Sequence, residues 1–233
     1  MTDPKTFTPN LVTVDGPAAS GKSSLSRTLA KSFGWKWVST GAFYRALAYV
    51  ARQRGVDLGD EEGLVRLAES SCWRVELDEE RTRVYLQRSN QASEQDVTDR
   101  IYQESVGSDA SRISQFQGVR RSLLEAQRQC AVGVQGLVAE GRDCGTVIFP
   151  QAPVKIYLTA ASDSRAQRRA QEQDQDWAEI QRAQIQRDRQ DSTRKAAPLQ
   201  IPEGAEVIDS SNMSLEQVVQ EAEKILRKKL LGL

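Results

Sequence analysis

Apolar positions near the start of the chain form first a short run and then a helical repeat. The run is LVTVD, residues 11–15, and its length is typical of a buried strand. The repeat that follows has the spacing of one helix face and comprises Leu25, Leu29, Ala30 and Phe33. The pattern therefore predicts a strand and a helix joined by the glycine-containing stretch GPAASG.

The same alternation continues to the end of the chain. Residues 35–39, WKWVS, predict a second strand, and residues 41–55 predict a helix that ends at Gly55. Three later runs predict further buried strands: GLVAEGRD (136–143), VKIYLTA (154–160) and AEVID (205–209). A helical pattern follows each of the last two, and Ser214 and Gln217 are placed as a capping box for the terminal helix. This order predicts an α/β protein whose parallel sheet is covered by helices on both faces.

Two segments depart from this alternation. Between Cys72 and Gln87, apolar and charged residues alternate on either side of a charged turn, which predicts an antiparallel hairpin inserted into the core. The stretch from Arg165 to Arg194 carries seven arginines and few apolar positions, so it buries little surface. It is either a solvated helix pair or a mobile, arginine-bearing lid.

Length and charge narrow the class of protein. A chain of 233 residues with 39% hydrophobic positions suits one core, so we expect residues 1–233 to form a single domain. Lysine plus arginine (32) balance aspartate plus glutamate (32), so no overall basic field recruits nucleic acid or an anionic membrane. We therefore expect neither as a partner, and binding sites must be identified locally.

Cysteine and histidine usage narrow the chemistry. Cys72, Cys130 and Cys144 are widely spaced and form no C-x-x-C pair, which argues against a disulfide framework or a zinc site. The N-terminal stretch MTDPKTFTPN lacks the apolar core of a secretion signal, and no run approaches the roughly 18 apolar residues of a membrane span. We expect a cytoplasmic protein. Histidine is absent, so any chemistry uses Asp, Glu, Lys, Arg or a metal.

The loop after the first strand satisfies the phosphate-binding pattern G-x-x-x-x-G-K-[ST]. It lies between a predicted strand and a predicted helix, which is the context that the motif requires. Its backbone N–H groups and the helix N-terminus attract phosphate, and Lys22 reaches the β- and γ-oxygens of a nucleotide. Either Ser23 or Ser24 offers a hydroxyl to Mg²⁺. The predicted ATP-binding residues are Gly16, Pro17, Ala18, Ala19, Ser20, Gly21, Lys22, Ser23 and Ser24.

Arginines follow two other predicted strands. STGAFYR contains Arg45 and EGRDCGT contains Arg142, at the strand ends where open α/β sheets bind ligands. The planar guanidinium binds phosphate oxygens in pairs, so Arg45 and Arg142 together indicate a second phosphate compound, although either alone fits a surface salt bridge. The guanine-reading string N-K-x-D of switch GTPases is absent from the sequence.

Five blocks of the chain resemble, in order and over nearly its whole length, those of the bacterial cytidylate kinase family. They are GPAASGKSS, STGAFYR, EGRDCGTVIFPQAPVKIYLTA, RDRQDSTRKAAPL and VIDSSNMSLEQV. The resemblance implies a P-loop three-layer fold with a central parallel sheet flanked by helices. It also implies an acceptor-binding segment at about 42–111 that carries the hairpin insert, and a helical lid at about 162–192. The implied reaction transfers the γ-phosphoryl group of ATP to CMP or dCMP with Mg²⁺, and we expect a monomer.

The resemblance also implies roles for individual residues. Lys22, Arg142 and Arg194 are the implied catalytic groups. The acceptor phosphate is contacted by Thr40, Arg45, Arg142 and Arg194. Ser111, Arg120 and Asp143 face the cytosine edge, and Arg187 and Asp191 face the sugar. The chain differs from the common family pattern in having Thr40 for serine, Glu140 for aspartate and a second serine after Lys22.

The chemistry of a phosphate acceptor agrees with this expectation. A phosphate monoester has a second pKa near ~6, so it is largely a nucleophilic dianion at neutral pH and requires no general base. Arg165, Arg168 and Arg169 are candidates for neutralising charge on the transferring group, or they lie on a solvated helix face. A carboxylate at Asp143 accepts a hydrogen bond from the cytosine amino group and repels the uracil carbonyl, but it also suits a helix N-cap or a salt bridge with Arg142. A kinase for another monophosphate such as UMP and a non-catalytic nucleotide sensor are the alternatives.

Overall fold

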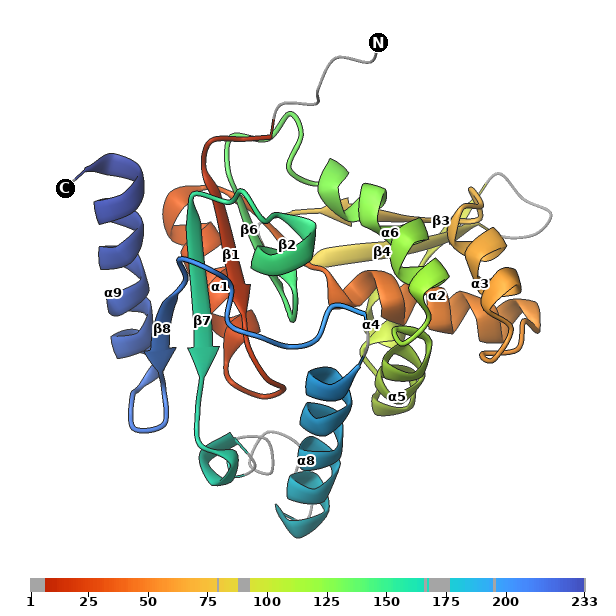
Figure 1. Ribbon diagram of the computed structural model, residues 1–233. Coiled ribbons are helices and arrows are strands. Elements are labelled where there is room, and N and C mark those ends of the chain that lie inside the picture. Colours follow the sequence, from red (N-terminus) through yellow and green to blue (C-terminus); the bar gives the residue numbers. More distant parts are fainter. Residues whose placement is uncertain are drawn as a thin grey trace.

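The computed structural model describes residues 7–78, 80–87, 93–165, 167, 177–194 and 196–232, and its centre is a five-stranded sheet (Figure 1). The strand order is β2-β6-β1-β7-β8, and every neighbouring pair is parallel. The strands are β1 (Leu11–Asp15), β2 (Lys36–Ser39), β6 (Leu137–Gly141), β7 (Val154–Thr159) and β8 (Glu206–Asp209). Each lies in a segment for which the sequence predicts a strand, so the α/β prediction is confirmed.

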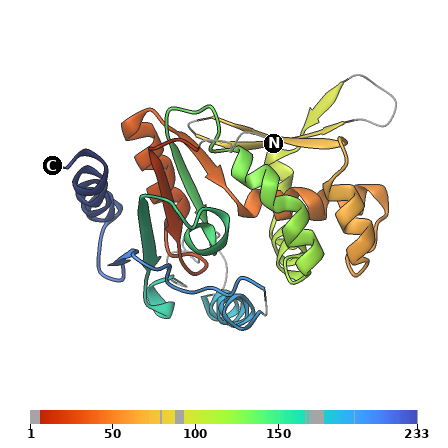
Figure 2. The ribbon, with the colours of Figure 1, turned by 45° about the horizontal axis from the view of Figure 1, so that its top comes forward.

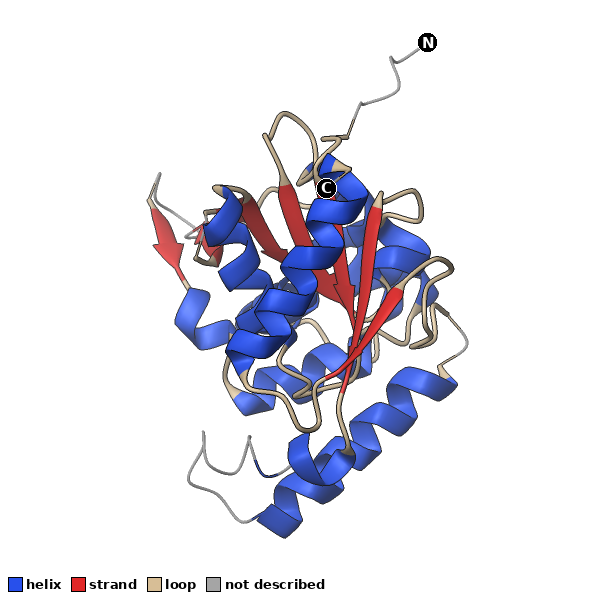
Figure 3. Ribbon diagram, turned by 90° about the vertical axis from the view of Figure 1, so that its left-hand side faces the viewer, coloured by secondary structure: helices blue, strands red, loops and turns tan. Residues whose placement is uncertain are grey.

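Helices cover both faces of this sheet because its strands are apolar on both sides. Val12 and Val14 of β1 pack with α1 (Lys22–Phe33) and α9 (Leu215–Leu226), and Figure 3 shows α9 in front of the strands. Leu11 and Leu137 belong to a second apolar cluster with α2 (Gly41–Arg54) and α6 (Gln117–Gln129) on the opposite face. The sheet is therefore the middle of three layers.

The predicted helix boundaries in the first and last parts of the chain are confirmed. Helix α2 ends at Gly55, whose φ of 68° is left-handed and suits glycine. Helix α9 begins with the predicted capping box, in which Gln217 N–H donates to Ser214 Oγ at 3.3 Å and Ser214 N–H donates to Gln217 Oε1 at 2.8 Å. The terminal turn η2 (Arg227–Leu231) continues this helix.

The predicted hairpin is present and belongs to a separate antiparallel sheet. Strands β3 (Trp73–Leu77) and β4 (Thr82–Gln87) pair around the charged turn, and β5 (Glu94–Asp96) adds a third strand that the sequence pattern did not predict. Figure 2 shows this sheet, in orange and yellow, beside the orange and green helices of the same half of the chain. It is joined to the core because Thr82 Oγ1 accepts the N–H of Ser39, at the end of β2, at 2.9 Å.

Four helices between β2 and β6 were not predicted from the apolar pattern. They are α3 (Glu61–Ala68), α4 (Thr98–Ile101), α5 (Glu104–Ile113) and α6. Helix α6 buries Arg120 and Gln127 together with Val119 and Leu123, so its inward face is half polar and gives a weak apolar repeat. The buried polar residues of α6 therefore explain why the apolar pattern did not predict this helix.

Two further elements lie at the carboxyl ends of the strands. A turn of π-helix, η1 (Cys144–Ile148), follows β6 after Arg142 and Asp143, and α8 (Trp177–Thr193) lies beyond the carboxyl ends of the strands in the arginine-rich segment (Figure 1). Within the described residues, no helix is long and apolar enough to cross a membrane.

Candidate active site

The P-loop packs closely against β7, and the side chain of its own lysine bonds back to the loop. Gly16 has a φ of 151°, and a Cβ atom there would lie 2.0 Å from the carbonyl oxygen of Leu158 in β7, so only glycine fits. Lys22 begins α1, and its Nζ donates to the carbonyl oxygen of Pro17 at 2.5 Å and to Ser20 Oγ at 3.4 Å. Burial, and then the nearby charge of Arg142, lowers the pKa of Lys22 to about 7. A bound polyphosphate would restore its charge.

The first serine after Lys22 faces a buried carboxylate. Ser23 Oγ donates to Glu140 Oε1 at 2.8 Å, whereas the other oxygen, Glu140 Oε2, is buried without a hydrogen-bond partner among the described residues. Burial raises the pKa of Glu140, and the charge of Lys22 opposes this shift. Hydroxyl and carboxylate oxygens are the protein ligands that Mg²⁺ prefers, so this pair fits a hydrated magnesium ion.

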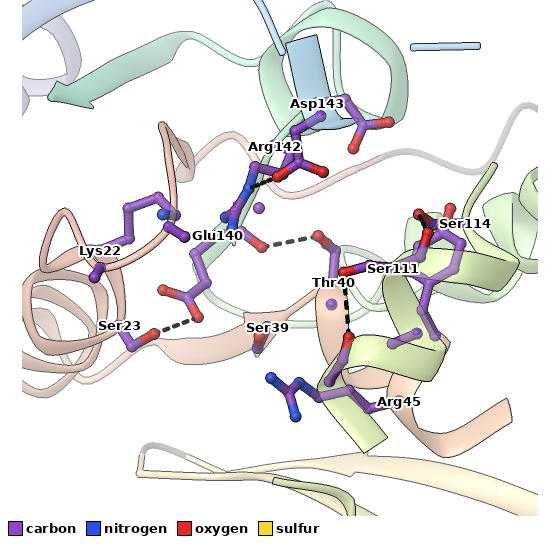
Figure 4. A pocket seen from close by; sticks show the side chains of 18 of the residues that line it. Lys22, Ser23, Ser39, Thr40, Arg45, Ser111, Ser114, Glu140, Arg142 and Asp143 are labelled. Carbon is purple, nitrogen blue, oxygen red and sulfur yellow. Dashed lines mark hydrogen bonds and ion pairs between the residues drawn. The ribbon is translucent and has the colours of Figure 1, made fainter. Parts of the chain in front are cut away.

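The P-loop opens into a pocket of about 340 Å³ whose other walls include residues of α2, α5, α6 and α8. Figure 4 shows Lys22, Ser23 and Glu140 on one side of this pocket and Ser111 and Ser114 on the other. The predicted site residues that line it are Ala18, Ala19, Lys22, Ser23, Thr40, Arg45, Ser111, Arg120, Arg142, Asp143, Asp191 and Arg194. Five basic side chains and three carboxylates line this space, so it suits an anionic ligand.

The arginines of the pocket are held by neighbouring oxygens. Arg45 Nη1 donates to the carbonyl oxygens of Ile101 at 3.0 Å and Gln103 at 3.2 Å. Arg142 Nε donates to Asp191 Oδ2 at 2.7 Å. Arg194 Nη1 lies 3.8 Å from Asp191 Oδ1. Burial, and then the charge of Arg120, lowers the pKa of Arg194. These guanidinium groups are therefore oriented before any ligand arrives.

A buried ion pair forms the far wall. Arg120 Nη2 donates to Asp143 Oδ2 and Arg120 Nη1 donates to the carbonyl oxygen of Ser114 at 3.2 Å. The side chains of Arg120 and Asp143 are only 9% and 8% exposed, and the guanidinium lies 5.5 Å from the centre of the Tyr44 ring. The partner of Asp143 is thus Arg120, with Arg194 Nη2 at 3.7 Å, rather than the adjacent Arg142.

Strand register brings these groups together. Asp15 at the end of β1 lies opposite Gly141 of β6, and Ser39 of β2 lies opposite Glu140, so the loops that follow all three strands start at one level. Thr40 Oγ1 donates to the carbonyl oxygen of Glu140 at 2.8 Å, and this contact joins two of the loops. Figure 4 shows Thr40 between the Glu140 and Ser111 sides of the pocket.

Residues 12–228 match the family model described as cytidylate kinase. The chain belongs to the cytidylate kinase family. It is 53% identical over 220 residues to the cytidylate kinase of Bdellovibrio bacteriovorus, covering 94% of this chain and 99% of the relative. It is 40% identical to the cytidylate kinase of Azotobacter vinelandii, covering 91% and 93% of the two chains.

A solved structure outside this family shares its fold. The gluconokinase of Sinorhizobium meliloti aligns with a TM-score of 0.52 at 14% identity, covering 97% of both chains. The P-loop fold implied by the resemblance to bacterial cytidylate kinases is therefore confirmed.

Five predicted P-loop residues of this cytidylate kinase family member do not line the pocket. They are Gly16, Pro17, Ser20, Gly21 and Ser24. The backbone oxygen of Ser24 accepts a hydrogen bond from Thr28 Oγ1 within α1. The side chain of Arg187 lies outside the described part of the chain, as do Arg168 and Arg169.

Arg165, the remaining lid candidate, contacts the P-loop backbone. Its Nη1 donates to the carbonyl oxygen of Ala18 at 3.0 Å and lies 2.6 Å from Asp188 Oδ2, and its side chain is 8% exposed. The other carboxylate oxygen of Asp188 accepts from the N–H of Ala18 at 3.3 Å. Arg165 is therefore not on a solvated helix face, and it connects α8 to the P-loop.

Several pocket residues were not among the predicted site residues. Glu140 was noted only as a departure from the family pattern, although its place at the carboxyl end of a central strand was a usable signal. Tyr44 lies inside the STGAFYR block, and burial raises the pKa of its hydroxyl to about 12. Cys144 follows Asp143 but does not line the pocket, and burial raises the pKa of its thiol, which keeps it unreactive.

Proposed function

We propose that this protein transfers the γ-phosphoryl group of ATP to CMP or dCMP, producing ADP and CDP or dCDP. One observation carries the proposal: a single pocket joins the P-loop lysine to three arginines and to a buried Arg120–Asp143 pair. The names of the relatives support the same reaction, because both described above are cytidylate kinases.

Phosphoryl transfer needs positioning and charge compensation rather than a base. An oxygen of the acceptor phosphate attacks the γ-phosphorus, and the bond from that phosphorus to the β-γ bridging oxygen breaks. We assign Arg45, Arg142 and Arg194, with the Thr40 hydroxyl, to the acceptor phosphate. Lys22, Arg142 and Arg194 act on the charge of the transferring group. Because these cations are already oriented, little energy is needed to reorganise them when charge develops in the transition state.

Mg²⁺ is assigned to Ser23 and Glu140. The unpaired, buried Glu140 Oε2 and the Ser23–Glu140 contact favour Ser23 over Ser24 as the hydroxyl ligand. When bound, the ion neutralises β- and γ-phosphate charge. Glu140 fixes the Ser23 hydroxyl, and Lys22 is assigned to the same phosphates.

Cytosine is read by the buried pair. The Asp143 carboxylate accepts from the cytosine amino group, Arg120 donates to N3 or O2, and Ser111 lies on the same wall. Uracil presents a carbonyl to Asp143 and leaves two acceptors facing each other, which disfavours UMP. Asp191, with Arg187, is assigned to the sugar side.

We assign residues 42–111 to acceptor binding and 162–192 to the lid, within one domain. Arg165 and Asp188 tie the lid segment to Ala18 of the P-loop, which supports a closure coupled to ATP binding. Every group that the proposed reaction uses comes from one chain, so we infer a monomer. The free thiols of Cys72, Cys130 and Cys144 support a cytoplasmic location.

The test is ADP release with ATP and Mg²⁺ in the presence of CMP, dCMP, UMP or AMP. We expect rapid turnover with CMP and dCMP, slow turnover with UMP, and loss of turnover when Mg²⁺ is chelated. A nucleotide sensor would bind ATP and CMP without acceptor-dependent ADP release, and a UMP kinase would reverse the preference. Either outcome would refute the proposal.

A further inference from the structure

Asp15 is a buried carboxylate that the proposed reaction does not use. It ends β1, directly before Gly16 of the P-loop, and its side chain is inaccessible to solvent. Its Oδ1 accepts the N–H of Cys144 at 2.7 Å and its Oδ2 accepts the N–H of Gly145 at 2.7 Å. Both donors are the first residues of η1, so the carboxylate caps the amino end of that turn.

The carboxyl end of the same turn is held by a charge of opposite sign. Arg128 of α6 donates from Nε to the carbonyl oxygen of Ile148 at 2.9 Å and from Nη2 to that of Val147 at 3.0 Å. An anion at the amino end and a cation at the carboxyl end both complement the dipole of a helical turn. The turn η1 is therefore fixed at both ends by side chains from two other elements.

Packing leaves this arrangement little freedom. A Cβ atom at Gly145 would lie 2.9 Å from Thr13 Oγ1 and 3.1 Å from Asp15 Oδ2, so the turn lies directly against β1. Arg142 and Asp143 immediately precede the turn, and their side chains face the pocket. Any shift of Cys144 or Gly145 would move the carboxylate of Asp143 and the guanidinium of Arg142.

We propose that Asp15 is a positioning residue for the acceptor site and that, with Arg128, it holds Arg142 and Asp143 in register with the P-loop. This inference rests on the proposed function, because it assigns Asp143 to the base and Arg142 to the acceptor phosphate. Asp15 touches neither nucleotide; it acts through the backbone of η1. A single carboxylate thereby joins the P-loop to the segment that carries Arg142 and Asp143.

The test compares Asp15→Asn and Arg128→Met with the intact chain, at pH 8. Asparagine keeps the size of Asp15 but turns an amide N–H₂ toward one of the two backbone N–H groups. We expect the KM for CMP to rise roughly tenfold or more, and the KM for ATP to rise clearly less, through loss of the Asp15 charge near Lys22. The ratio of kcat/KM for CMP over UMP should fall at least about threefold, because Asp143 is no longer fixed. Arg128→Met should shift both quantities in the same direction.

Two controls separate positioning from general destabilisation. Asp60→Asn makes the same chemical change at a carboxylate that caps α3 by accepting the N–H of Gly63 at 2.9 Å, away from the pocket. Val218→Ala removes a buried side chain of α9 on the other face of the sheet and should lower the melting temperature. Neither control should change the CMP to UMP ratio.

The outcomes distinguish this inference from the proposed function. If the intact chain does not phosphorylate CMP, the proposed function fails. If the intact chain is active but Asp15→Asn and Arg128→Met lower only the melting temperature, or raise both KM values equally, the positioning role is refuted. If Asp15→Asn does not fold, the same two measurements on Arg128→Met decide the question.

Discussion

Replacing Asp143 with asparagine tests the base-reading assignment directly. The carboxylate is 8% exposed and lies between two guanidinium groups, those of Arg120 and Arg194, which are 9% and 7% exposed. Removing one partner of a buried ion pair typically costs about 3 to 5 kcal/mol of stability. Asparagine keeps an oxygen that can accept from Arg120, so we expect a loss at or below the lower end of that range.

The effect on base choice follows from donors and acceptors. The asparagine side chain can rotate to donate to the uracil carbonyl, so the polar mismatch that disfavours UMP disappears. Such a mismatch is worth about 1 to 3 kcal/mol, which corresponds to roughly a fivefold to 150-fold change in specificity. We therefore expect Asp143→Asn to lower the kcat/KM ratio of CMP over UMP by about that factor, mainly by raising kcat/KM for UMP.

The assay is coupled ADP release with each acceptor, and Asp191→Asn is the matched control. Asp191 is a second pocket carboxylate, 15% exposed and paired with Arg142 and Arg194, so its loss removes the same charge from the same space. We expect Asp191→Asn to change the ratio of CMP to dCMP and to leave the ratio of CMP to UMP unchanged. An unchanged CMP to UMP ratio in Asp143→Asn, or an equal fall in both variants, would refute the assignment.

Two further predictions concern the P-loop. Gly16→Ala should lower the free energy of unfolding by about 2 to 5 kcal/mol and abolish ATP binding, because the added Cβ meets the Leu158 carbonyl oxygen. The control is Gly204→Ala, at a φ of 72° with open space around it, which should cost only about 1 to 2 kcal/mol. Chemical denaturation measures both losses. Because the pKa of Lys22 is lowered to about 7, the group is largely neutral at pH 8 in the free protein and must take up a proton when ATP phosphates bind. ATP affinity should therefore fall as the pH rises from 7 to 9. Calorimetry in buffers of different ionisation enthalpy should show proton uptake at pH 8, and buffer-independent heats would contradict the lowered pKa.

The central sheet was predictable because its strands are buried runs with little to disguise them. LVTVD and VKIYLTA contain few polar positions, and the structure places both in the sheet with a neighbouring strand on each side. Helix α6 escaped prediction for the opposite reason, since it buries Arg120 and Gln127 on the face that packs inward. The Gln127 side chain donates to the carbonyl oxygen of Thr40 at 3.2 Å, so these buried polar groups serve the site rather than the core.

Pairing across elements was less accessible to sequence reasoning than the identity of the residues. The GRD block indicated that Arg142 and Asp143 belong to a ligand site, and both line the pocket. Their partners come from α6 and α8, and no spacing rule relates Arg120 to Asp143 or Arg142 to Asp191. The alternative of an Asp143–Arg142 salt bridge was therefore reasonable from the sequence, and it is wrong because Asp143 pairs with Arg120 and Arg142 pairs with Asp191.

These internal pairs have a consequence for how a phosphate enters. Before a ligand arrives, Asp191 holds Arg142 and approaches Arg194, so acidic side chains already occupy part of the coordination of the arginines. An incoming dianion must displace or share these contacts, which lowers affinity but keeps each guanidinium in a fixed orientation. The register of β1, β2 and β6 sets where those orientations converge, since Asp15, Ser39 and Gly141 end their strands at one level. Under the proposed function, the sheet therefore aligns the donor and acceptor phosphates, and α8 contributes Asp191, which orients Arg142.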